Sequence, residues 1–507
     1  MSFAFSSIGL WPHRRAQLTP QRVAIRIDDR SVTYAELDAR AARCANALTA
    51  AGIGPGDRVA AYLDTGLEYV DLLFGCARIG AILVPLSTRL APPELAFMTE
   101  DSGAALLVYD AARAEAVKAF RPQTGVRAAF AVGDADDPSY EAAVAAASPE
   151  HEPADIGPDE VLAIFYTSGT TGRPKGAMLT HGNFFWTNLN MLVSSGFEQD
   201  ERTLVVLPLF HVGGWNVNTL AVWWVGGTVL LERSFDPERA LALIAEQRVT
   251  SMMGVPTIYQ MMADDPSFAA TDLSSVRTFV CGGAPLPVSL IERYQQRGIR
   301  FVQGYGLTEA APNCLILPPE DAVAKAGAAG RPYFFTDVRV VDEADEPVPP
   351  GGAGEVIVRG PSVMKGYWRR PEETARALRG GWLRTGDVGR IDADGYVFIV
   401  DRVKDMFISG GENVYPAEVE GVLHGHPDVA EAAVIGVPDE RWGEVGRAIV
   451  VLRSGATTTE AALKTFCAEQ LARFKVPTSV VFADTLPRNA TGKLLKQQLR
   501  ERHGAAS

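Results

Sequence analysis

The segment 164–176 holds the densest set of side chains that could do chemistry, namely small hydroxyl residues and glycines that end in a lysine. From residue 166 it reads Tyr-Thr-Ser-Gly-Thr-Thr-Gly-Arg-Pro-Lys-Gly, directly after an apolar run that is typical of a strand. Such a loop offers backbone N–H groups and hydroxyls to phosphate oxygens, and Lys175 adds a positive charge. Because it contains no Gly-Lys-Ser/Thr, it is not the common P-loop of kinases. The segment therefore predicts a phosphate site of another type.

Further motifs follow this loop along the chain. They are Phe210-His211 after an apolar run, Gly-Gly-Ala-Pro at 282–285, Gln-Gly-Tyr-Gly-Leu-Thr-Glu at 303–309, Leu-Arg-Thr-Gly-Asp at 383–387, Asp-Arg-Val-Lys-Asp at 401–405, Gly-Gly-Glu-Asn-Val-Tyr-Pro at 410–416 and Pro-Arg-Asn-Ala-Thr-Gly-Lys at 487–493. In this order the motifs resemble the adenylate-forming superfamily, which includes acyl-CoA synthetases, peptide-synthetase adenylation domains and firefly-type luciferases. The resemblance covers nearly the whole chain, and its best match is to the acyl-CoA synthetases.

The resemblance implies an ATP-dependent carboxylic acid–CoA ligase (AMP-forming). A carboxylate oxygen attacks the α-phosphorus of ATP, pyrophosphate leaves, and coenzyme A then displaces AMP from the acyl-adenylate. Because both partners of the first step are anions, the site must neutralise charge and fix their positions. The cofactors implied are ATP, Mg²⁺ and coenzyme A, with Mg²⁺ on Glu309. The catalytic residues implied are Lys493, which stabilises the transition state at the α-phosphate, together with Glu309, Lys175 and Thr308.

The same resemblance assigns a nucleotide site in three parts: the phosphate loop, an adenine pocket in which Tyr305 stacks on the base, and an Asp–Arg pair at the ribose. Glycines let the backbone approach a flat ring closely, and an aromatic side chain adds contact area. The nucleotide-binding residues implied are Thr167, Ser168, Gly169, Thr170, Thr171, Lys175, Gly282, Gly283, Ala284, Pro285, Gly304, Tyr305, Gly306, Thr308, Asp387 and Arg402.

For the second step the family rotates its small C-terminal domain. Lys493 then leaves the active site, and a glycine-rich segment faces the adenylate and the CoA thiol. The CoA-binding residues implied are Ser409, Gly410, Gly411 and Glu412, and Lys404 matches the hinge position. We expect neither a covalent acyl-enzyme nor a catalytic cysteine.

His211 resembles the ring that gates the acid pocket, although a capped core histidine is the alternative for this residue. The acyl-binding residues implied are His211, Val212, Gly214, Trp215, Asn216, Gly254, Val255, Cys281 and Gly306. They are mostly small and apolar, and no arginine stands where malonate-type ligases are expected to carry one, so the pattern favours a hydrophobic monocarboxylate.

Several substrate readings stay open. A medium- or long-chain fatty acid is placed first, narrowly ahead of an aryl-propenoic acid of the feruloyl or 4-coumaroyl type, because bacterial feruloyl-CoA synthetases look similar around residues 178–183 and 303–312. Amino-acid activation is disfavoured, since amino-acid activators place an aspartate beside Phe210. A non-catalytic regulator that only binds acyl groups or nucleotide is also disfavoured, because binding alone would not require Lys493.

The elements that must position these residues alternate between short apolar runs and helical stretches up to about residue 250. Residues 34–51 carry apolar side chains at helical spacing, and residues 58–63 and 81–86 are buried-strand candidates. This alternation predicts an α/β fold, with a large N-terminal domain built on two parallel-rich sheets. From about residue 338 short strands and Pro/Gly turns predict an antiparallel or β-barrel-like section.

The last hundred residues predict a small, mobile α+β domain, with a helix at 416–424, strands at 432–437 and 447–452, and a helix at 459–471. We place the domain boundary at 400/401, which gives an adenylation domain over 1–400 and a lid domain over 401–507. With 507 residues the chain exceeds the size of a single core.

The composition excludes some partners. A net charge of −13 argues against nucleic acid, because phosphate backbones need a positive surface. Scattered cysteines and the lack of a signal-like start favour a reduced, cytoplasmic protein. The most apolar segment is broken by glycines, so no transmembrane segment is expected, and Trp223 and Trp224 are placed in the core. The expected partners are thus a carboxylic acid, ATP and CoA, and a homodimer is compatible with the sequence.

Overall fold

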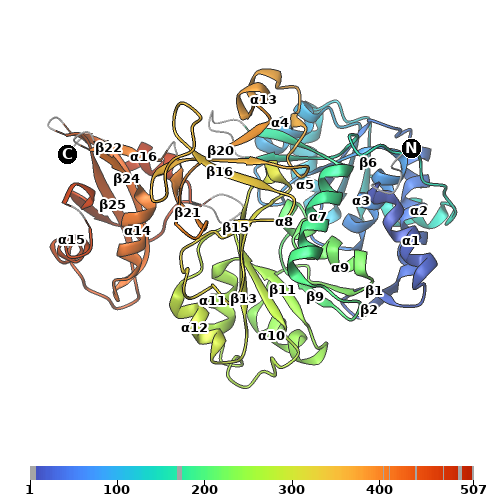
Figure 1. Ribbon diagram of the computed structural model, residues 1–507. Helices are drawn as coiled ribbons and strands as arrows, with labels where there is room; N and C mark the ends of the chain where they lie inside the picture. The colour runs from blue at the N-terminus through green and yellow to red at the C-terminus, as the bar shows by residue number, and fades with distance from the viewer. Residues whose placement is uncertain are drawn as a thin grey trace. The chain divides into compact units, whose positions relative to one another are not determined.

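The computed structural model describes residues 7–167, 174–402, 405–409, 412–439, 442–471, 473–488 and 494–504. The chain forms two compact units (Figure 1). The first unit comprises Met1–Val338 and Ile357–Arg384, and the second comprises Arg339–Val356 and Thr385–Ser507.

A nine-stranded sheet of the first unit has the order β15-β14-β13-β12-β11-β9-β10-β1-β2. The strands from β13 to β1 in this order pair in parallel, whereas β14, β15 and β2 are antiparallel additions at the two edges. The strand bounds are β1 Val23–Ile27, β2 Arg30–Thr33, β9 Arg202–Val205, β10 Thr228–Leu231, β11 Ser251–Gly254, β12 Thr278–Gly282, β13 Phe301–Gly306, β14 Asn313–Leu317 and β15 Arg331–Pro332.

Alternate residues of β12 and β13 enter two different hydrophobic clusters. Phe279 and Phe301 pack with side chains of α10 (Pro237–Glu246), α11 (Pro256–Asp264) and α12 (Val288–Gln295). Val280 and Val302 instead pack with residues of α7 (His181–Ser195) and α9 (Thr219–Val225). Because successive side chains of a strand point to opposite faces, the sheet is covered by helices on both sides, as a mainly parallel sheet requires (Figure 1).

A seven-stranded sheet of the first unit has the order β18-β8-β7-β4-β3-β5-β6. Its strand bounds are β3 Arg58–Tyr62, β4 Ile82–Pro85, β5 Leu106–Asp110, β6 Ala128–Val132, β7 Val161–Thr167, β8 Lys175–Thr180 and β18 Gly366–Tyr367. The helices that belong to this part of the chain are α1 Trp11–Leu18, α2 Tyr34–Ala50, α3 Leu67–Ile79, α4 Pro92–Ser102, α5 Ala114–Phe120, α6 Tyr140–Ala146 and α13 Pro371–Ala377.

The predicted α/β alternation is confirmed in this region. The helix expected at 34–51 is α2, and its first turn is fixed by a capping box in which Thr33 Oγ1 accepts from Glu36 N while the Glu36 carboxylate accepts from Thr33 N. The strands expected at 58–63 and 81–86 are β3 and β4, and they pair in parallel.

The short strand β18 brings a distant part of the chain beside the phosphate loop. It pairs antiparallel with β8, and Trp368 N donates to Gly176 O at 2.7 Å. Lys365 N donates to Met178 O at 3.0 Å on the same strand. Residues that come almost two hundred positions later in the chain are thereby held against the strand that begins at Lys175.

A third sheet has the order β16-β17-β20-β19, with β21 paired to β20, and its longer strands pass from one unit into the other. It is the section that the sequence predicted to be antiparallel or barrel-like, and its pairs β19–β20 and β20–β21 are antiparallel. The bounds are β16 Asp337–Val341, β17 Ala353–Arg359, β19 Leu378–Arg379, β20 Trp382–Ile391 and β21 Val397–Arg402.

The C-terminal part of the second unit is the expected α+β structure. Its sheet has the order β23-β22-β25-β24, with β26 paired to β25, and the predicted helix at 416–424 is α14 with the same bounds. The bounds of the remaining elements are β22 Phe407–Ser409, β23 Glu412–Val414, α14 Pro416–His424, β24 Val429–Asp439, β25 Gly443–Leu452, α15 Glu460–Ala468, β26 Ser479–Phe482 and α16 Lys496–His503. Val419, Leu423 and Cys467 anchor α14 and α15 in its core.

The predicted domain boundary at 400/401 stays a prediction. The division into compact units groups residues 339–356 and 385–400 with the C-terminal part of the chain.

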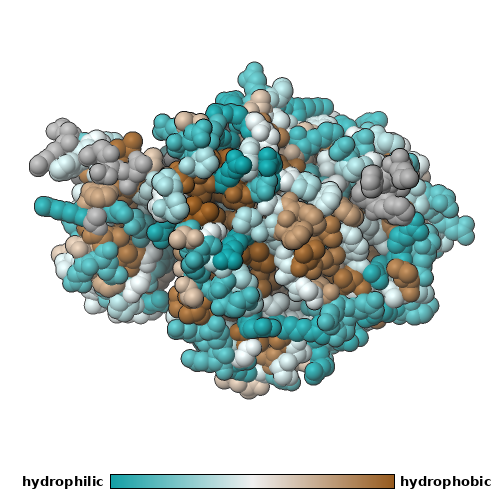
Figure 2. Space-filling view, in the orientation of Figure 1, coloured by the Kyte–Doolittle hydropathy of each residue, from teal (hydrophilic) through white to brown (hydrophobic). Residues whose placement is uncertain are grey.

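A row of aromatic side chains lies at the surface of the first unit. Trp224 packs between Trp11 and Phe185, with ring centroids 4.7 and 5.0 Å away. Figure 2 shows hydrophobic residues gathered on the face along which α7 and α9 run. The expected core placement is confirmed for Trp223, which is buried and donates Nε1 to Ala24 O, whereas Trp224 is half-buried. No helix in the described part of the chain combines the length and the apolar character that a bilayer span needs.

Candidate active site

The carboxyl ends of three parallel strands place predicted site residues side by side. In the strand pairing Gly254 of β11 lies opposite Cys281 of β12, and Gly282 of β12 lies opposite Gly304 of β13. Ligands of open α/β sheets bind at this end of the strands. The sheet therefore brings together residues that the sequence assigned to the acid pocket and to the adenine pocket.

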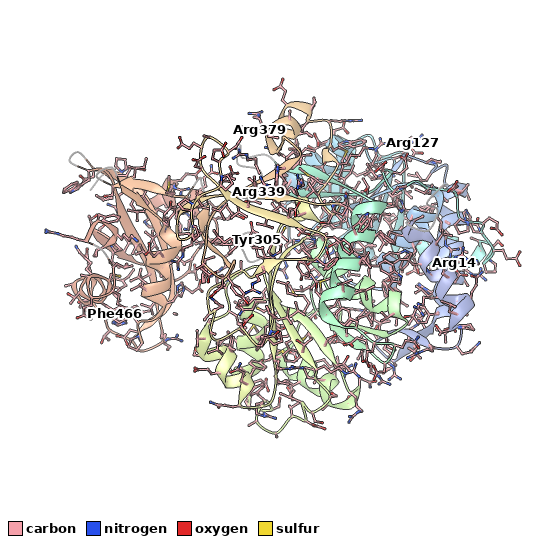
Figure 3. The ribbon with its side chains drawn as sticks, in the orientation of Figure 1. Arg14, Arg127, Tyr305, Arg339, Arg379 and Phe466 are labelled. Atoms are coloured by element: carbon pink, nitrogen blue, oxygen red, sulfur yellow. The ribbon has the colours of Figure 1, made fainter. Side chains whose placement is uncertain are left out.

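The residues at the ends of β12 and β13 differ in how much space and exposure they have. A Cβ on Gly306 would lie 1.4 Å from Pro312 O, so only glycine fits where β13 turns toward β14. Tyr305 is half-buried between Gly304 and Gly306 on β13 (Figure 3). Gly283, Ala284 and Pro285 follow β12 and are exposed, so the proposed adenine pocket has one accessible wall.

Glu309 is buried and one of its carboxylate oxygens is held by two hydroxyl groups. Thr167 Oγ1 and Tyr367 Oη each donate to Glu309 Oε1 at 3.0 Å. The backbone is fixed as well, because Met364 N donates to Glu309 O at 2.8 Å. The other oxygen, Oε2, has no hydrogen-bond or ion-pair partner in the described part of the chain. The carboxylate is thus oriented before any ligand binds.

Tyr367 acts on Glu309 as a neutral donor. Burial of the phenol, and then the negative charge of Glu309, raise the pKa of Tyr367 far above its ordinary value, so that its proton is retained at neutral pH. Lys175 Nζ lies 5.4 Å from the centroid of the Tyr367 ring, which is cation–π distance. Tyr367 therefore joins the metal-site carboxylate expected at Glu309 to the lysine of the phosphate loop.

The two ends of the phosphate loop are fixed by strand pairing. Thr167 ends β7, Lys175 begins β8, and these two residues are directly paired. Ser168, Gly169, Thr170 and Thr171, which the sequence assigned to nucleotide binding, lie outside the described residues. At these two strand ends, Thr167 contacts Glu309 and Lys175 contacts the ring of Tyr367.

The donor set fits a magnesium ion that is bound together with phosphates. Among the residues that the structure describes, no three His, Cys, Asp or Glu side chains gather into a site that could hold a metal alone. Mg²⁺ prefers six oxygen ligands and is usually held by one or two carboxylates, substrate phosphates and water. Glu309 Oε2 is a suitable single protein ligand for that arrangement.

His211 is a buried neutral imidazole at the start of α8 (Val212–Asn216). Burial, with a smaller contribution from the positive charge of Arg89, lowers the pKa of His211 to about 4. Its Nε2 atom is buried without a hydrogen-bond partner among the described residues. A neutral ring with one uncommitted nitrogen can contact a polar group of a ligand without adding charge.

The helix α8 that follows His211 is packed tightly on one side and loosely on the other. A Cβ on Gly214 would lie 2.7 Å from Pro208 O, whereas one on Gly213 would meet nothing within 4 Å. Gly213, Asn218 and Met253 border a small cavity of about 10 Å³, close to the size that a single water needs. Trp215 is fully buried and donates Nε1 to Leu209 O at 2.6 Å.

The remaining acid-pocket predictions fall into two classes of burial. Val212, Asn216 and Cys281 are buried, whereas Val255 is half-buried at the start of α11. Cys281 is not activated, because burial raises the pKa of its thiol well above the usual range. A buried neutral thiol at this position is a poor nucleophile.

Two ribose-site predictions meet in the second unit. Asp387 of β20 pairs directly with Arg402 of β21 in the antiparallel ladder, and the Asp387 side chain is buried. The turn before it is fixed because Thr385 Oγ1 donates to Val356 O and accepts from Asp387 N. The backbone therefore sets these two residues side by side.

The residues predicted for the second step are only partly described. Ser409 of β22 pairs with Glu412 of β23 across the ends of a hairpin, and Ser409 is buried. Gly410 and Gly411 between them, Lys404 and Lys493 lie outside the described residues.

Sequence reasoning missed Tyr367 and the buried Asn188 that bonds to Asn216. Tyr367 follows Glu309 by 58 positions, and nothing in its local sequence marks a contact with that residue. Asn188 lies on α7, outside the segment that the sequence assigned to the acid pocket. These contacts arise from tertiary structure.

Comparison with known proteins gives matches over almost the full length. Residues 12–368 match the model of the AMP-binding enzyme family, and residues 418–493 match its C-terminal domain. The chain is 49% identical over 499 residues to a feruloyl-CoA synthase from an Amycolatopsis species, covering 98% of this chain and 99% of the relative. It is 42% identical over 503 residues to a long-chain-fatty-acid–CoA ligase of Mycobacterium tuberculosis, covering 98% and 99% of the two chains.

A similar solved structure is that of ATP-bound MatB from Rhodopseudomonas palustris. It superimposes with a TM-score of 0.90 at 36% sequence identity and covers 98% of this chain and 99% of that one. The similarity thus covers the fold of each unit, and the similar structure was solved with ATP bound.

The first prediction concerns the hydroxyl of Tyr367. Tyr367→Phe should lower the rate of acid-dependent ATP–pyrophosphate exchange by about 10- to 100-fold, the usual effect of losing an outer partner of a metal ligand. The Mg²⁺ concentration for half-maximal exchange should rise at the same time, because Glu309 loses one of the donors that orient it.

Tyr166→Phe is the matched control. Tyr166 precedes Thr167 on β7 and donates its hydroxyl to Asp101, at 2.8 Å, instead of to Glu309. Its Mg²⁺ dependence should equal that of the unmodified enzyme. If Tyr367→Phe left both the rate and the Mg²⁺ dependence unchanged, the orienting role of Tyr367 would be wrong.

Proposed function

The chain belongs to the AMP-binding enzyme family, and from that premise we propose that the acid it activates is an aryl-propenoic acid of the hydroxycinnamic type, such as ferulic acid. The enzyme is an AMP-forming carboxylic acid–CoA ligase and uses ATP, Mg²⁺ and coenzyme A. The observation that supports the aryl acid most strongly is the identity to the feruloyl-CoA synthase, which exceeds that to the fatty-acid ligase over the same span.

A medium- or long-chain fatty acid is the second candidate, although the sequence alone placed it first. The fatty-acid ligase of Mycobacterium tuberculosis supports it, as do the apolar side chains of Val212 and Trp215 on α8. We rank it lower because the buried pocket segment also carries polar groups, which a hydrocarbon tail would leave without hydrogen-bond partners.

We assign the first step to residues of the first unit and to Lys493. A carboxylate oxygen of the acid forms a bond to the α-phosphorus of ATP, the bond from that phosphorus to the bridging oxygen breaks, and pyrophosphate leaves. Glu309 would hold Mg²⁺ through Oε2, and Mg²⁺ supplies charge neutralisation between phosphate oxygens when bound. Lys175 and the hydroxyl of Thr308 would contact the leaving phosphates, while Thr167 keeps its hydrogen bond to Glu309.

Lys493 would stabilise the transition state of the first step. A lysine is a compact point charge, so it can contact the incoming carboxylate and the α-phosphate together. Its charge would offset the negative charge that accumulates as the two anions approach.

The nucleotide would lie along the strand ends. Tyr305 would stack on adenine beside Gly282 and Gly304, and Asp387 with Arg402 would hold the ribose hydroxyls. Asp387 would accept from both hydroxyl groups, since a carboxylate has several acceptor sites.

We assign the second step to the 401–507 domain after a rotation at Lys404. The CoA sulfur forms a bond to the acyl carbon, the bond from that carbon to the adenylate oxygen breaks, and AMP leaves while the thiol proton passes to solvent. Ser409, Gly410, Gly411 and Glu412 would border the path of the pantetheine arm. The neutral His211 would face the acid without repelling or attracting its carboxylate strongly.

A cytoplasmic location is also part of the proposal, and it is supported by five cysteines that are all buried as free thiols. The homodimer considered from the sequence stays a prediction, and sedimentation of the purified protein would test it.

The second prediction is a substrate preference. Ferulic and 4-coumaric acids should give higher kcat/KM than octanoic, palmitic or malonic acid when AMP release is measured with CoA present. Pyrophosphate should also form without CoA, limited to about one equivalent per active site, because the adenylate stays bound. A clear preference for palmitic acid would favour the second candidate, and activation of no acid at all would refute the ligase assignment.

The third prediction separates the two steps. Lys493→Ala should abolish ATP–pyrophosphate exchange but leave thioester formation from preformed feruloyl-adenylate largely intact. Gly411→Leu should do the reverse, because a bulky side chain would obstruct the proposed CoA path. Equal loss of both steps in Lys493→Ala would contradict the two-conformation scheme.

A further inference from the structure

Two buried asparagine side chains meet beside the proposed acid pocket. Asn188 of α7 and Asn216 of α8 are both fully buried. Asn188 Nδ2 donates to Phe184 O at 2.8 Å and to Asn216 Oδ1 at 3.1 Å. In the described part of the chain, Asn188 Oδ1 and Asn216 Nδ2 have no hydrogen-bond partner. One acceptor and one donor are therefore left over on adjacent side chains.

The hydrogen bonds themselves fix which atoms are left over. A backbone carbonyl can only accept, so the Asn188 atom that contacts Phe184 O must be the NH₂ group. The Asn216 atom that accepts from the same NH₂ group must then be the oxygen. Exchanging the two ends of either amide would break one of these bonds, so the acceptor and the donor are not interchangeable.

The amide pair lies between two elements that carry acid-pocket residues. The helix of Asn216 begins directly after His211. On its other side, Asn313 Nδ2 donates to Asn216 O at 2.9 Å and to Thr187 Oγ1 at 3.0 Å. Asn313 in turn pairs with Gly306 across the β13–β14 ladder. Asn216 is thus linked to His211 through the backbone of α8 and to Gly306 through Asn313.

A buried amide group without a partner costs about 1–3 kcal/mol, so such a pair is stable only where something else completes it. One donor and one acceptor side by side match a hydroxyl group, which can donate to Asn188 Oδ1 and accept from Asn216 Nδ2 at the same time. The hydrogen-bond partners of the two asparagines among the described residues are uncharged, and Phe184, Met191 and Trp215, which lie within four residues of them in the sequence, are buried. A second carboxylate would therefore be poorly held there, whereas a neutral phenol would be well held.

We infer that Asn188 and Asn216 bind the ring hydroxyl of the acid and so determine which aryl acids the enzyme accepts. This inference rests on the proposed function, because it gives a site to the hydroxyl that distinguishes ferulic and 4-coumaric acids from cinnamic acid. The carboxylate of the acid would lie toward His211 and the nucleotide, and the hydroxyl would lie at the opposite end of the ring.

The fourth prediction tests this site with a pair of substrates that differ by one hydroxyl. For the unmodified enzyme kcat/KM should be about 10- to 100-fold higher for 4-coumaric acid than for cinnamic acid, since losing the hydroxyl leaves both amides unpaired. In Asn216→Leu that ratio should fall to about one, because the donor is gone. 4-Methoxycinnamic acid, which can accept but not donate, should fall between the two acids with the unmodified enzyme.

Asn190→Leu is the control. Asn190 lies on the same helix as Asn188 and is as deeply buried, but both ends of its amide are partnered, by Phe335 N and by Thr336 Oγ1. Its loss should cost stability and leave the ratio between the two acids unchanged. The ratio separates recognition of the hydroxyl from general damage to the fold.

Three outcomes would overturn the inference. The unmodified enzyme could show a ratio near one, which would mean that the pair holds a buried water only. Asn216→Leu could keep the full ratio, or Asn190→Leu could lose it equally. Failure of the proposed function is distinguishable, because neither cinnamic acid would then be activated while a fatty acid was. The substituent series on the unmodified enzyme decides the question even if Asn216→Leu does not fold.

Discussion

One oxygen of a buried carboxylate, Glu309 Oε1, accepts from two hydroxyl groups that come from distant parts of the chain. A buried carboxylate is unstable without donors, so β7 and β18 must both reach Glu309 for the site to form. The pairing of β18 with β8 achieves this and also sets Tyr367 beside Lys175. The seven-stranded sheet therefore brings the Glu309 carboxylate, which we propose as the metal ligand, close to Lys175 at the end of the phosphate loop, and Oε2 has no partner among the described residues.

The nine-stranded sheet has a different role in the proposal: the nucleotide and the acid would both bind at the same end of its strands. Small residues on β11, β12 and β13 leave few side-chain atoms at the strand ends where the nucleotide would lie. At the turn into β14, Gly306 leaves no room for a side chain. In the proposed function, the helix after His211 would form one wall of the acid pocket. Asn216 of this helix and Asn188 of α7 would make one end of that pocket polar. Such a pocket would suit a flat ring with one hydroxyl better than a flexible hydrocarbon chain.

The sequence predicted what depends on short-range pattern. The helices α2 and α14 and the parallel strands β3 and β4 follow from periodicity and local motifs. The sequence named Asp387 and Arg402 separately, and the pairing of β20 with β21 shows that they are neighbours. Tyr367 and Asn188 could not be predicted, because each acquires its role from a partner far away in sequence, and neither the spacing nor the residue type signals that contact. An asparagine inside an apolar helix is compatible with a simple buried amide until its partners are known.

The central claim is that Glu309 binds the metal only together with the phosphates of ATP. Mn²⁺ can replace Mg²⁺ as a spectroscopic probe, and its free concentration can be followed by electron paramagnetic resonance during a titration of the enzyme. We expect weak Mn²⁺ binding by the enzyme alone and much tighter binding once ATP is present, with the gain largely lost in Glu309→Gln. Tight binding of Mn²⁺ in the absence of nucleotide, or an unchanged gain in Glu309→Gln, would contradict the account.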